Sequence, residues 1–173
     1  MHDVLSKAAQ IQLVIFDVDG VLTDGRLYLG NDGNEFKAFH IRDGHGIKML
    51  LDAGVDIAII SGRHAASVER RIADLGIRYA YLGVQDKRTA FNNLLVRLSL
   101  TADQVAYVGD DLIDLPVMTQ AGLAVAVQDA DPFVRQHAHW QTPHRGGYGA
   151  ARDVCELVLE ARGQLGSARR RYL

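Results

Sequence analysis

Continuous apolar runs along the chain predict a buried parallel sheet. These runs are rich in β-branched residues and do not alternate with polar positions, which is typical of strands covered on both faces. Five runs have this character: Gln12–Phe16, Val55–Ile60, Tyr79–Leu82, Val105–Val108 and Ala124–Val127. Strands of this kind belong to a sheet that carries helices on each side.

Segments with helical spacing separate the predicted strands. Apolar residues recur there every three or four positions, and a glycine follows several of the segments, as at the end of a helix. The predicted helices are Gly46–Ala53, Ala65–Leu75, Thr89–Leu98, Asp114–Ala121 and Val154–Ala161. This alternation predicts an α/β fold, a Rossmann-like parallel sheet with helices on both faces.

One segment departs from the alternation. Asn31-Asp32-Gly33 is a tight-turn signal between two strand-like runs, Arg26–Gly30 and Asn34–His40, so we expect one β-hairpin projecting from the α/β body. An isolated hairpin is barely stable in water, which favours packing against another copy of the chain. We expect residues 1–173 to form a single domain, with the hairpin at about 26–40 and a C-terminal tail at about 164–173.

The composition is that of an ordinary globular protein. Hydrophobic residues make up 48% of the chain and charged residues 23%, and the formal net charge is −2. This charge gives no bulk attraction to nucleic acid or to an anionic membrane. No run approaches the roughly 18 apolar residues of a membrane span. We therefore expect a cytoplasmic protein without nucleic-acid or membrane partners, whose single cysteine, Cys155, lies in the core.

Polar side chains follow four of the predicted strands, at the sheet edge where open parallel sheets bind ligands. Any one of these groups alone is commonly a turn, a helix cap or a solvated side chain. In chain order they are Asp17 and Asp19, then Ser61-Gly62-Arg63, then Lys87, then Gly109-Asp110-Asp111 with Asp114. Four such groups in succession predict an active site.

The residue types in this set suit phosphoryl transfer. A carboxylate such as Asp17 is able to attack phosphorus and form an acyl-phosphate, which water then cleaves. Because that carboxylate repels a phosphate dianion, a hard cation is needed, and Mg²⁺ held by Asp17 and Asp110 meets the need. Asp19 is free to protonate the leaving oxygen and to deprotonate the attacking water. Ser61 and Lys87 would hold the transferred oxygens.

The ordered motifs resemble those of the haloacid-dehalogenase superfamily of phosphatases over residues 12–127. The motifs are Asp-x-Asp-Gly-Val-Leu-Thr-Asp, an apolar run with Ser-Gly-Arg, a lysine and Gly-Asp-Asp-x-x-Asp. The resemblance implies that Asp17 is the nucleophile and Asp19 the general acid and base. It implies phosphate contacts from Ser61 and Lys87.

The same resemblance implies a magnesium site and a fourth motif. It gives the Mg²⁺ ligands as Asp17, the backbone carbonyl of Asp19 and Asp110, and it places Asp111 and Asp114 in the fourth motif without a defined duty. The intervals between motifs leave no room for a cap domain. An open site is poor for hydrolysis, so we expect a neighbouring subunit to cover it.

Other segments are similar to one capless branch, the 3-deoxy-D-manno-octulosonate 8-phosphate (KDO 8-phosphate) phosphatases. They include Asp24-Gly25, Lys37-Ala38-Phe39, residues 42–47 and residues 145–150. This resemblance covers nearly the whole chain and implies a sugar acid phosphate as substrate, Mg²⁺ as cofactor and a role in lipopolysaccharide biosynthesis. It also implies a homotetramer that assembles through the hairpin, and a C-terminal tail able to reach a neighbour's site.

Two arginines are candidates for recognising the substrate, which carries a carboxylate as well as a phosphate. The resemblance places Arg63 at the rim of the site. It gives the same duty to Arg71, eight residues further and roughly 12 Å along the helix. The main alternative is a phosphatase for a nine-carbon sugar acid 9-phosphate of the sialic acid type. Relatives of that type tend to carry Glu at the position of Arg63, which favours KDO 8-phosphate.

Two non-enzymatic alternatives remain. A phosphoacceptor signalling domain also uses an aspartyl phosphate and Mg²⁺, but it places its acidic pair before the acceptor strand. Here Asp110-Asp111 follows Asp17 by more than ninety residues, so the order disfavours that class. A non-catalytic homologue used for assembly is disfavoured because both Asp17 and Asp19 are retained.

Overall fold

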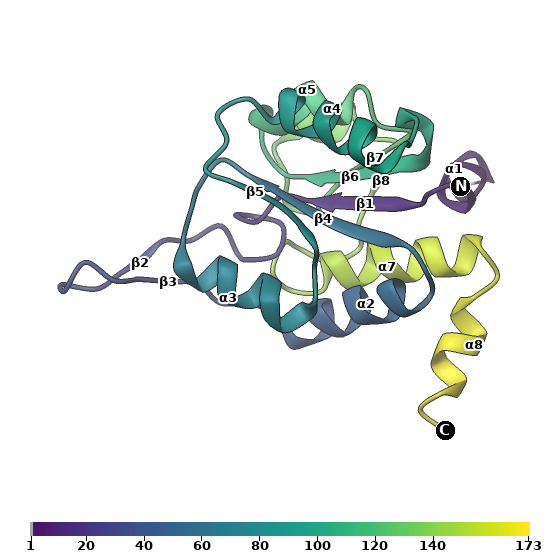
Figure 1. The fold of residues 1–173 in the computed structure, drawn as a ribbon, viewed down its shortest axis with the longest axis horizontal. Helices are drawn as coiled ribbons and strands as arrows, with labels where there is room; N and C mark the ends of the chain where they lie inside the picture. Colours follow the sequence, from purple (N-terminus) through teal and green to yellow (C-terminus); the bar gives the residue numbers. More distant parts are fainter. Residues whose placement is uncertain (1) are drawn as a thin grey trace.

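A computed structural model describes residues 2–173 and contains a six-stranded sheet (Figure 1). Every paired strand in it runs parallel to its neighbour. In sheet order the strands are β5 (Tyr79–Leu82), β4 (Asp56–Ser61), β1 (Leu13–Phe16), β6 (Val105–Gly109), β7 (Leu123–Ala126) and β8 (Trp140–Gln141). The five predicted strands are confirmed. The sixth, β8, has only two residues, too few to leave a pattern in the sequence.

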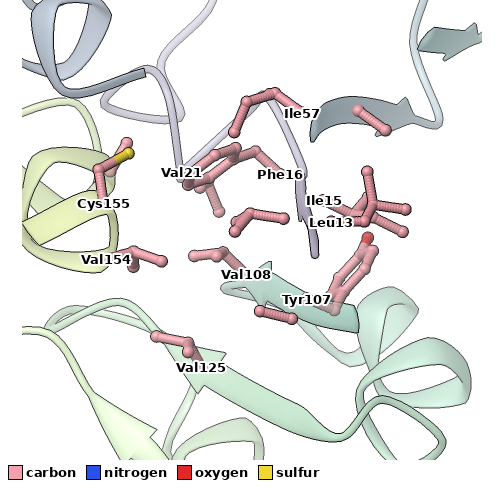
Figure 2. Close-up of a cluster of buried hydrophobic side chains, with 14 of the residues drawn as sticks. Leu13, Ile15, Phe16, Val21, Ile57, Tyr107, Val108, Val125, Val154 and Cys155 are labelled. Atoms are coloured by element: carbon pink, nitrogen blue, oxygen red, sulfur yellow. The ribbon is translucent and has the colours of Figure 1, made fainter. Parts of the chain in front are cut away.

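The sheet is covered on both faces, as its continuous apolar strands require. Figure 1 shows α2 (Ile41–Asp52), α3 (Ala66–Leu75) and α7 (Ala150–Ala161) on one face, with α4 (Lys87–Leu98) and α5 (Leu115–Met118) on the other. Every residue of β1, β6 and β7 is buried. Figure 2 shows part of this core, where Val108 of β6 packs toward Val154 of α7.

The shorter elements complete the chain. They are α1 (His2–Ala9), α6 (Pro132–Gln136), α8 (Leu165–Arg170) and two 3₁₀ turns, Ala102–Gln104 and Leu112–Asp114. Within residues 2–173, no helix combines the length and the apolar character that crossing a membrane demands.

Three predicted helices need correction. The helix predicted for Val154–Ala161 begins at Ala150 instead, where Asp43 accepts from the Arg152 N–H in its first turn. The helix predicted for Gly46–Ala53 begins at Ile41 instead, because the ring of His40 accepts a hydrogen bond from the Arg42 N–H (3.2 Å) and caps it. The helix predicted for Asp114–Ala121 is a 3₁₀ turn followed by the single turn of α5. The Asp111 carboxylate caps the 3₁₀ turn at the Leu112 N–H, and Pro116 lies in the first turn of α5, where no N–H donor is needed. The C-terminal tail is helical as α8, with Arg169 paired to Glu156 at 2.7 Å.

The side chain of Asp43 ties α2 to α7. It accepts hydrogen bonds from the backbone N–H groups of Gly149 (3.3 Å) and Arg152 (2.9 Å), which lie in the first turn of α7 and have no helical partner. Gly46 also lets the helices approach closely, since a Cβ there would press on Arg152. The two helices are more than a hundred residues apart in the chain, and the Asp43 hydrogen bonds hold them side by side on one face of the sheet.

The predicted hairpin is present, with shorter strands than expected. Strands β2 (Tyr28–Leu29) and β3 (Glu35–Phe36) pair antiparallel, and the turn is closed by the Gly30 N–H and the Asn34 carbonyl at 2.8 Å. The hairpin projects from the body of the molecule in Figure 1. Leu29 is 71% exposed and Phe36 60%, so residues 2–173 leave these apolar side chains of the hairpin largely uncovered.

Candidate active site

The three central strands bring the predicted catalytic groups together. Asp17 follows the last residue of β1, Ser61 ends β4 and Asp110 follows β6, and β1 lies between the other two strands. An open cavity of about 220 Å³ lies at this edge. It is lined by Asp17, Asp19, Gly25, Ser61, Gly62, Arg63, Asp110, Asp111 and Ile113. Most of the predicted site residues therefore share one cavity.

Asp17 is a buried carboxylate paired with one lysine. Its side chain is 5% exposed, and the Lys87 Nζ lies 3.0 Å from its Oδ1. Burial, followed by repulsion from Asp114, raises the pKa of Asp17 to about 7 against the opposing effect of Lys87. Burial disfavours the Lys87 ammonium, but attraction to Asp17 and Asp114 outweighs it and raises the pKa of Lys87 above its usual range.

Asp114, given no defined duty by its motif, organises the neighbouring groups. Its side chain is completely buried. Oδ1 accepts hydrogen bonds from the Lys87 ammonium and the Tyr107 hydroxyl, both at 2.7 Å. Oδ2 accepts from the backbone N–H groups of Asp110 (3.0 Å) and Asp111 (3.2 Å). One carboxylate thus fixes both the lysine and the loop after β6.

The carboxylates of Asp17 and Asp110 fit a magnesium ion. These two and Asp114 offer oxygens that all lie within 4.8 Å of one another. Asp114 is already engaged in four hydrogen bonds, whereas the buried Oδ1 of Asp110 has no hydrogen-bond partner among residues 2–173. Burial, followed by repulsion from Asp114 and Asp17, raises the pKa of Asp110 to about 8. Clustered hard oxygens that repel one another are what Mg²⁺ binds.

The loop after β1 passes close to the Asp110 carboxylate. Gly20 has φ +86°, a conformation that favours glycine, and a Cβ there would overlap the Asp110 carboxylate. The backbone of the loop after β1 therefore approaches Asp110 as closely as it does only because residue 20 is glycine. A carbonyl ligand from this loop, as predicted for Asp19, is consistent with that approach.

We expect the metal-free protein to lose stability as pH rises from 5 to 8. In the folded chain Asp17 and Asp110 keep protons up to about pH 7 and 8, whereas their ordinary pKa is 3.8. The folded state therefore binds more protons than the unfolded state in this interval, and unfolding becomes easier as pH increases. Saturating Mg²⁺ should remove the effect, since the cation replaces the protons.

Thermal melts at pH 5, 6, 7 and 8, in EDTA and in excess Mg²⁺, measure this dependence. Asp110→Asn removes one of the two groups and should flatten the EDTA curve, while Asp74→Asn, an exposed change on α3, should not. A Tm in EDTA that increases over this range would contradict the assignment of these carboxylates. Turnover should vanish in EDTA and return with Mg²⁺.

Asp19 lies in a second cluster of charges, at the cavity wall. Its Oδ1 pairs with Lys37, and its Oδ2 lies 3.8 Å from the Nε of Arg63. Glu35 contacts both bases, with Oε1 2.9 Å from Lys37 and Oε2 2.7 Å from Arg63. Hydrogen bonds from Lys37 and Arg63 lower the pKa of Glu35, so it is ionised at neutral pH. Glu35 and Lys37 belong to the hairpin segment.

Of the remaining predicted residues, Ser61, Gly62 and Asp111 line the cavity and Arg71 does not. Ser61 is buried, with its hydroxyl oxygen accepting from the Arg63 N–H at 3.3 Å, and Gly62 lines the cavity beside it. Asp111 caps the next 3₁₀ turn through the Leu112 N–H (2.7 Å). Arg71 is not among the cavity residues. Its guanidinium donates to the His40 carbonyl (3.4 Å) between α2 and α3, so its contact with substrate stays a prediction.

Three residues of the site were missed in the sequence: Tyr107, Glu35 and Lys37. Tyr107 is the one hydroxyl in an otherwise aliphatic strand, a signal that it has a buried partner. Glu35 and Lys37 are two apart in the strand-like run predicted for Asn34–His40, a spacing that predicts side chains on the same side of a strand. In the structure β3 ends at Phe36, and Lys37 follows it directly. That spacing places them together, but nothing in it shows that they face Asp19.

The parallel sheet and the four motifs at its edge define the class of haloacid dehalogenase-like hydrolases, and the sequence pattern of that family matches residues 82–152. The 3-deoxy-D-manno-octulosonate 8-phosphate phosphatase KdsC of Escherichia coli K12 is 52% identical over 167 residues. That match covers 96% of this chain and 89% of the relative. The chain belongs to the 3-deoxy-D-manno-octulosonate 8-phosphate phosphatase family.

Solved structures agree with this membership. A probable YrbI family phosphatase from Pseudomonas syringae superposes with a TM-score of 0.98 at 52% identity, covering 99% of this chain and 98% of the other. The 3-deoxy-D-manno-octulosonate 8-phosphate phosphatase of Moraxella catarrhalis, solved with magnesium, phosphate and KDO, gives 0.98 at 38% identity, with coverage of 100% and 99%. The predicted α/β fold without a cap domain is confirmed.

Proposed function

We propose that this chain is a Mg²⁺-dependent phosphatase that hydrolyses KDO 8-phosphate to KDO and phosphate, a step of lipopolysaccharide biosynthesis. The observation that carries the proposal is the buried Asp17, which Lys87 holds in a cavity that Asp19 and Arg63 also line. The names of the relatives supply the substrate, and the Moraxella catarrhalis structure contains the product pair, KDO and phosphate.

The reaction proceeds in two displacements at phosphorus, with Asp17 as the nucleophile of the first and the leaving group of the second. A carboxylate oxygen of Asp17 attacks phosphorus while the bond between phosphorus and the sugar oxygen breaks, and Asp19 gives a proton to that oxygen. Asp19 then takes a proton from water, which attacks the phosphorus of the aspartyl phosphate. The acyl-phosphate P–O bond breaks, phosphate leaves and the Asp17 carboxylate is restored.

Neighbouring residues hold the transferred group during both displacements. The Lys87 ammonium and the Ser61 hydroxyl are placed to bind phosphoryl oxygens, which stabilises charge that spreads over them. Mg²⁺ on Asp17, Asp110 and the Asp19 carbonyl would neutralise the repulsion between the Asp17 carboxylate and the phosphate dianion. These assignments are proposals. They are supported by the cavity that Asp17, Asp19, Ser61 and Asp110 share, and by the contact of Lys87 with Asp17 at 3.0 Å.

Arg63 is the proposed contact for the substrate carboxylate. Half of its side chain is exposed, it lines the cavity, and Glu35 pairs with its guanidinium at 2.7 Å. Arg63→Glu replaces attraction by repulsion, so kcat/KM for KDO 8-phosphate should fall on the order of 10- to 100-fold, the worth of a hydrogen bond to a charged group. The loss should be smaller for a hexose phosphate, which has no carboxylate.

A panel of sugar phosphates assayed with both proteins measures this change in preference. The wild type should prefer KDO 8-phosphate to a nine-carbon sugar acid 9-phosphate and to simple hexose phosphates. An equal loss on all substrates would show that Arg63 acts only on the shared phosphate chemistry. Preference of the wild type for the nine-carbon substrate would support the sialic acid alternative.

We propose that the chain acts as a homotetramer assembled through the hairpin. The exposed Leu27, Leu29 and Phe36 support this, because an unsupported hairpin is only marginally stable. The absence of a cap domain supports it too, since a neighbouring subunit would then cover the open cavity. In this arrangement assembly and catalysis are coupled.

Charged substitutions on the hairpin test that coupling. Leu27→Glu with Leu29→Glu should dissociate the oligomer and lower kcat/KM together, although neither residue lines the cavity. Val96→Glu is the control, because Val96 is an equally apolar and more exposed residue (82%) on α4. Light scattering and steady-state kinetics on the same samples decide the matter. A folded monomer with full activity would refute the coupling.

A further inference from the structure

The lysine at the base of the hairpin is buried although the hairpin itself is exposed. Phe36 points outward with 60% of its surface exposed, while the side chain of the next residue, Lys37, has no exposed surface. Burying an ammonium costs several kcal/mol unless opposite charges surround it. A methionine would fill the same space without that cost, so packing alone does not account for the charge.

Lys37 closes a ring of four charges around Asp19. Lys37 holds Oδ1 of Asp19, and Arg63 approaches Oδ2 at 3.8 Å. Glu35 bridges the two bases from the far side, at 2.9 Å from Lys37 and 2.7 Å from Arg63. The ring is neutral, with two acids and two bases. Each oxygen of Asp19 therefore has its own cationic neighbour, and the carboxylate has one orientation.

The orientation of the Asp19 carboxylate matters because Asp19 is proposed to transfer a proton. A proton donor must lie within hydrogen-bond reach of the oxygen it serves, and small displacements lower rates steeply. Asp19 follows β1 on a loop, and within the described residues its side chain has no ion-pair partner besides the two bases of the ring. Lys37 reaches it from a separate segment, eighteen residues further along the chain.

We propose that Lys37 is a positioning residue for the phosphatase reaction, acting through Asp19, with Glu35 holding Lys37 in place. This inference rests on the proposed function. It also gives the hairpin a task inside its own subunit, besides its proposed task in assembly. Anything that shifts the base of the hairpin would then change the orientation of Asp19.

A double-mutant cycle tests the proposal. Lys37→Met should lower kcat on the order of 10²-fold, the effect of a misplaced catalytic group, with KM near the wild-type value. In an Asp19→Asn background the same change should cause almost no further loss, because the group that Lys37 positions is already disabled. Lys48→Met, at an exposed position on α2, is the matched control and should leave both backgrounds unchanged.

Each outcome bears on one claim. An equal loss in both backgrounds, or no loss in either, overturns the positioning role of Lys37. Should Lys37→Met fail to fold, Glu35→Gln enters the same cycle, with a smaller but equally background-dependent loss expected. The cycle uses 4-nitrophenyl phosphate alongside KDO 8-phosphate. A wild type inactive on KDO 8-phosphate but active on the aryl ester would refute the proposed substrate while still allowing the test of Lys37.

Discussion

Asp17→Asn should abolish turnover. An amide oxygen is too weak a nucleophile to displace an alkoxide from phosphorus, and Asp17 is the proposed attachment point of the covalent intermediate. We expect kcat to fall at least about 10⁴-fold, as when the nucleophile is removed from other covalent enzymes. The fold should survive, since the amide keeps the volume of the carboxylate and one acceptor for Lys87, 3.0 Å away in the native protein.

The measurement combines steady-state kinetics with acid-quench trapping of labelled phosphate on the protein. Wild type should retain acid-stable label, and Asp17→Asn should retain none. Asp19→Asn should lose about 10²- to 10⁴-fold in turnover, the usual contribution of a general acid–base group. Asp74→Asn, on the surface of α3, is the control for the change of charge. Near-normal turnover by Asp17→Asn would exclude the aspartyl-phosphate mechanism.

The central strands and their polar ends were predictable from the sequence. Strands β1 and β6 are buried on both faces, so each appears as an unbroken apolar run, and the residues that follow, Asp17 and Asp110, are marked by the sudden change to carboxylates. Parallel strands place such ends at one sheet edge. The pattern of apolar runs and carboxylates was therefore enough to predict which residues gather at this edge.

Contacts between distant segments were not predictable in the same way. Asp43 belongs to a motif in α2, but its partners are backbone N–H groups of α7, and no periodicity marks a pair more than a hundred residues apart. A lysine in a strand-like run is usually solvated. Lys37 is buried against Asp19 only because of the path that the hairpin takes. Arg71 shows the opposite case, because helix spacing gave its distance along α3 but not the direction of its side chain.

The duty of Asp114, left open by its motif, follows from its four hydrogen bonds. The residue is completely buried and accepts from Lys87, Tyr107 and two backbone N–H groups, so every lone pair has a donor. An asparagine of the same shape supplies acceptors for only one side. Its amide N–H₂ would face either Lys87 with Tyr107 or the two backbone N–H groups, and like donors repel.

We therefore expect Asp114→Asn, in saturating Mg²⁺, to lower the free energy of unfolding by about 3 kcal/mol, the cost of breaking a buried ion pair. It should also reduce kcat, because Lys87 and the Asp110 loop lose their common support.

Tyr107→Phe removes one of the four donors and should cost about 1 kcal/mol. Asp74→Asn, on the exposed surface of α3, is the control for the change of charge. Urea unfolding monitored with activity separates the three variants. Wild-type stability of Asp114→Asn would show that Lys87 holds its place without Asp114, and that Asp17 alone is enough to anchor it.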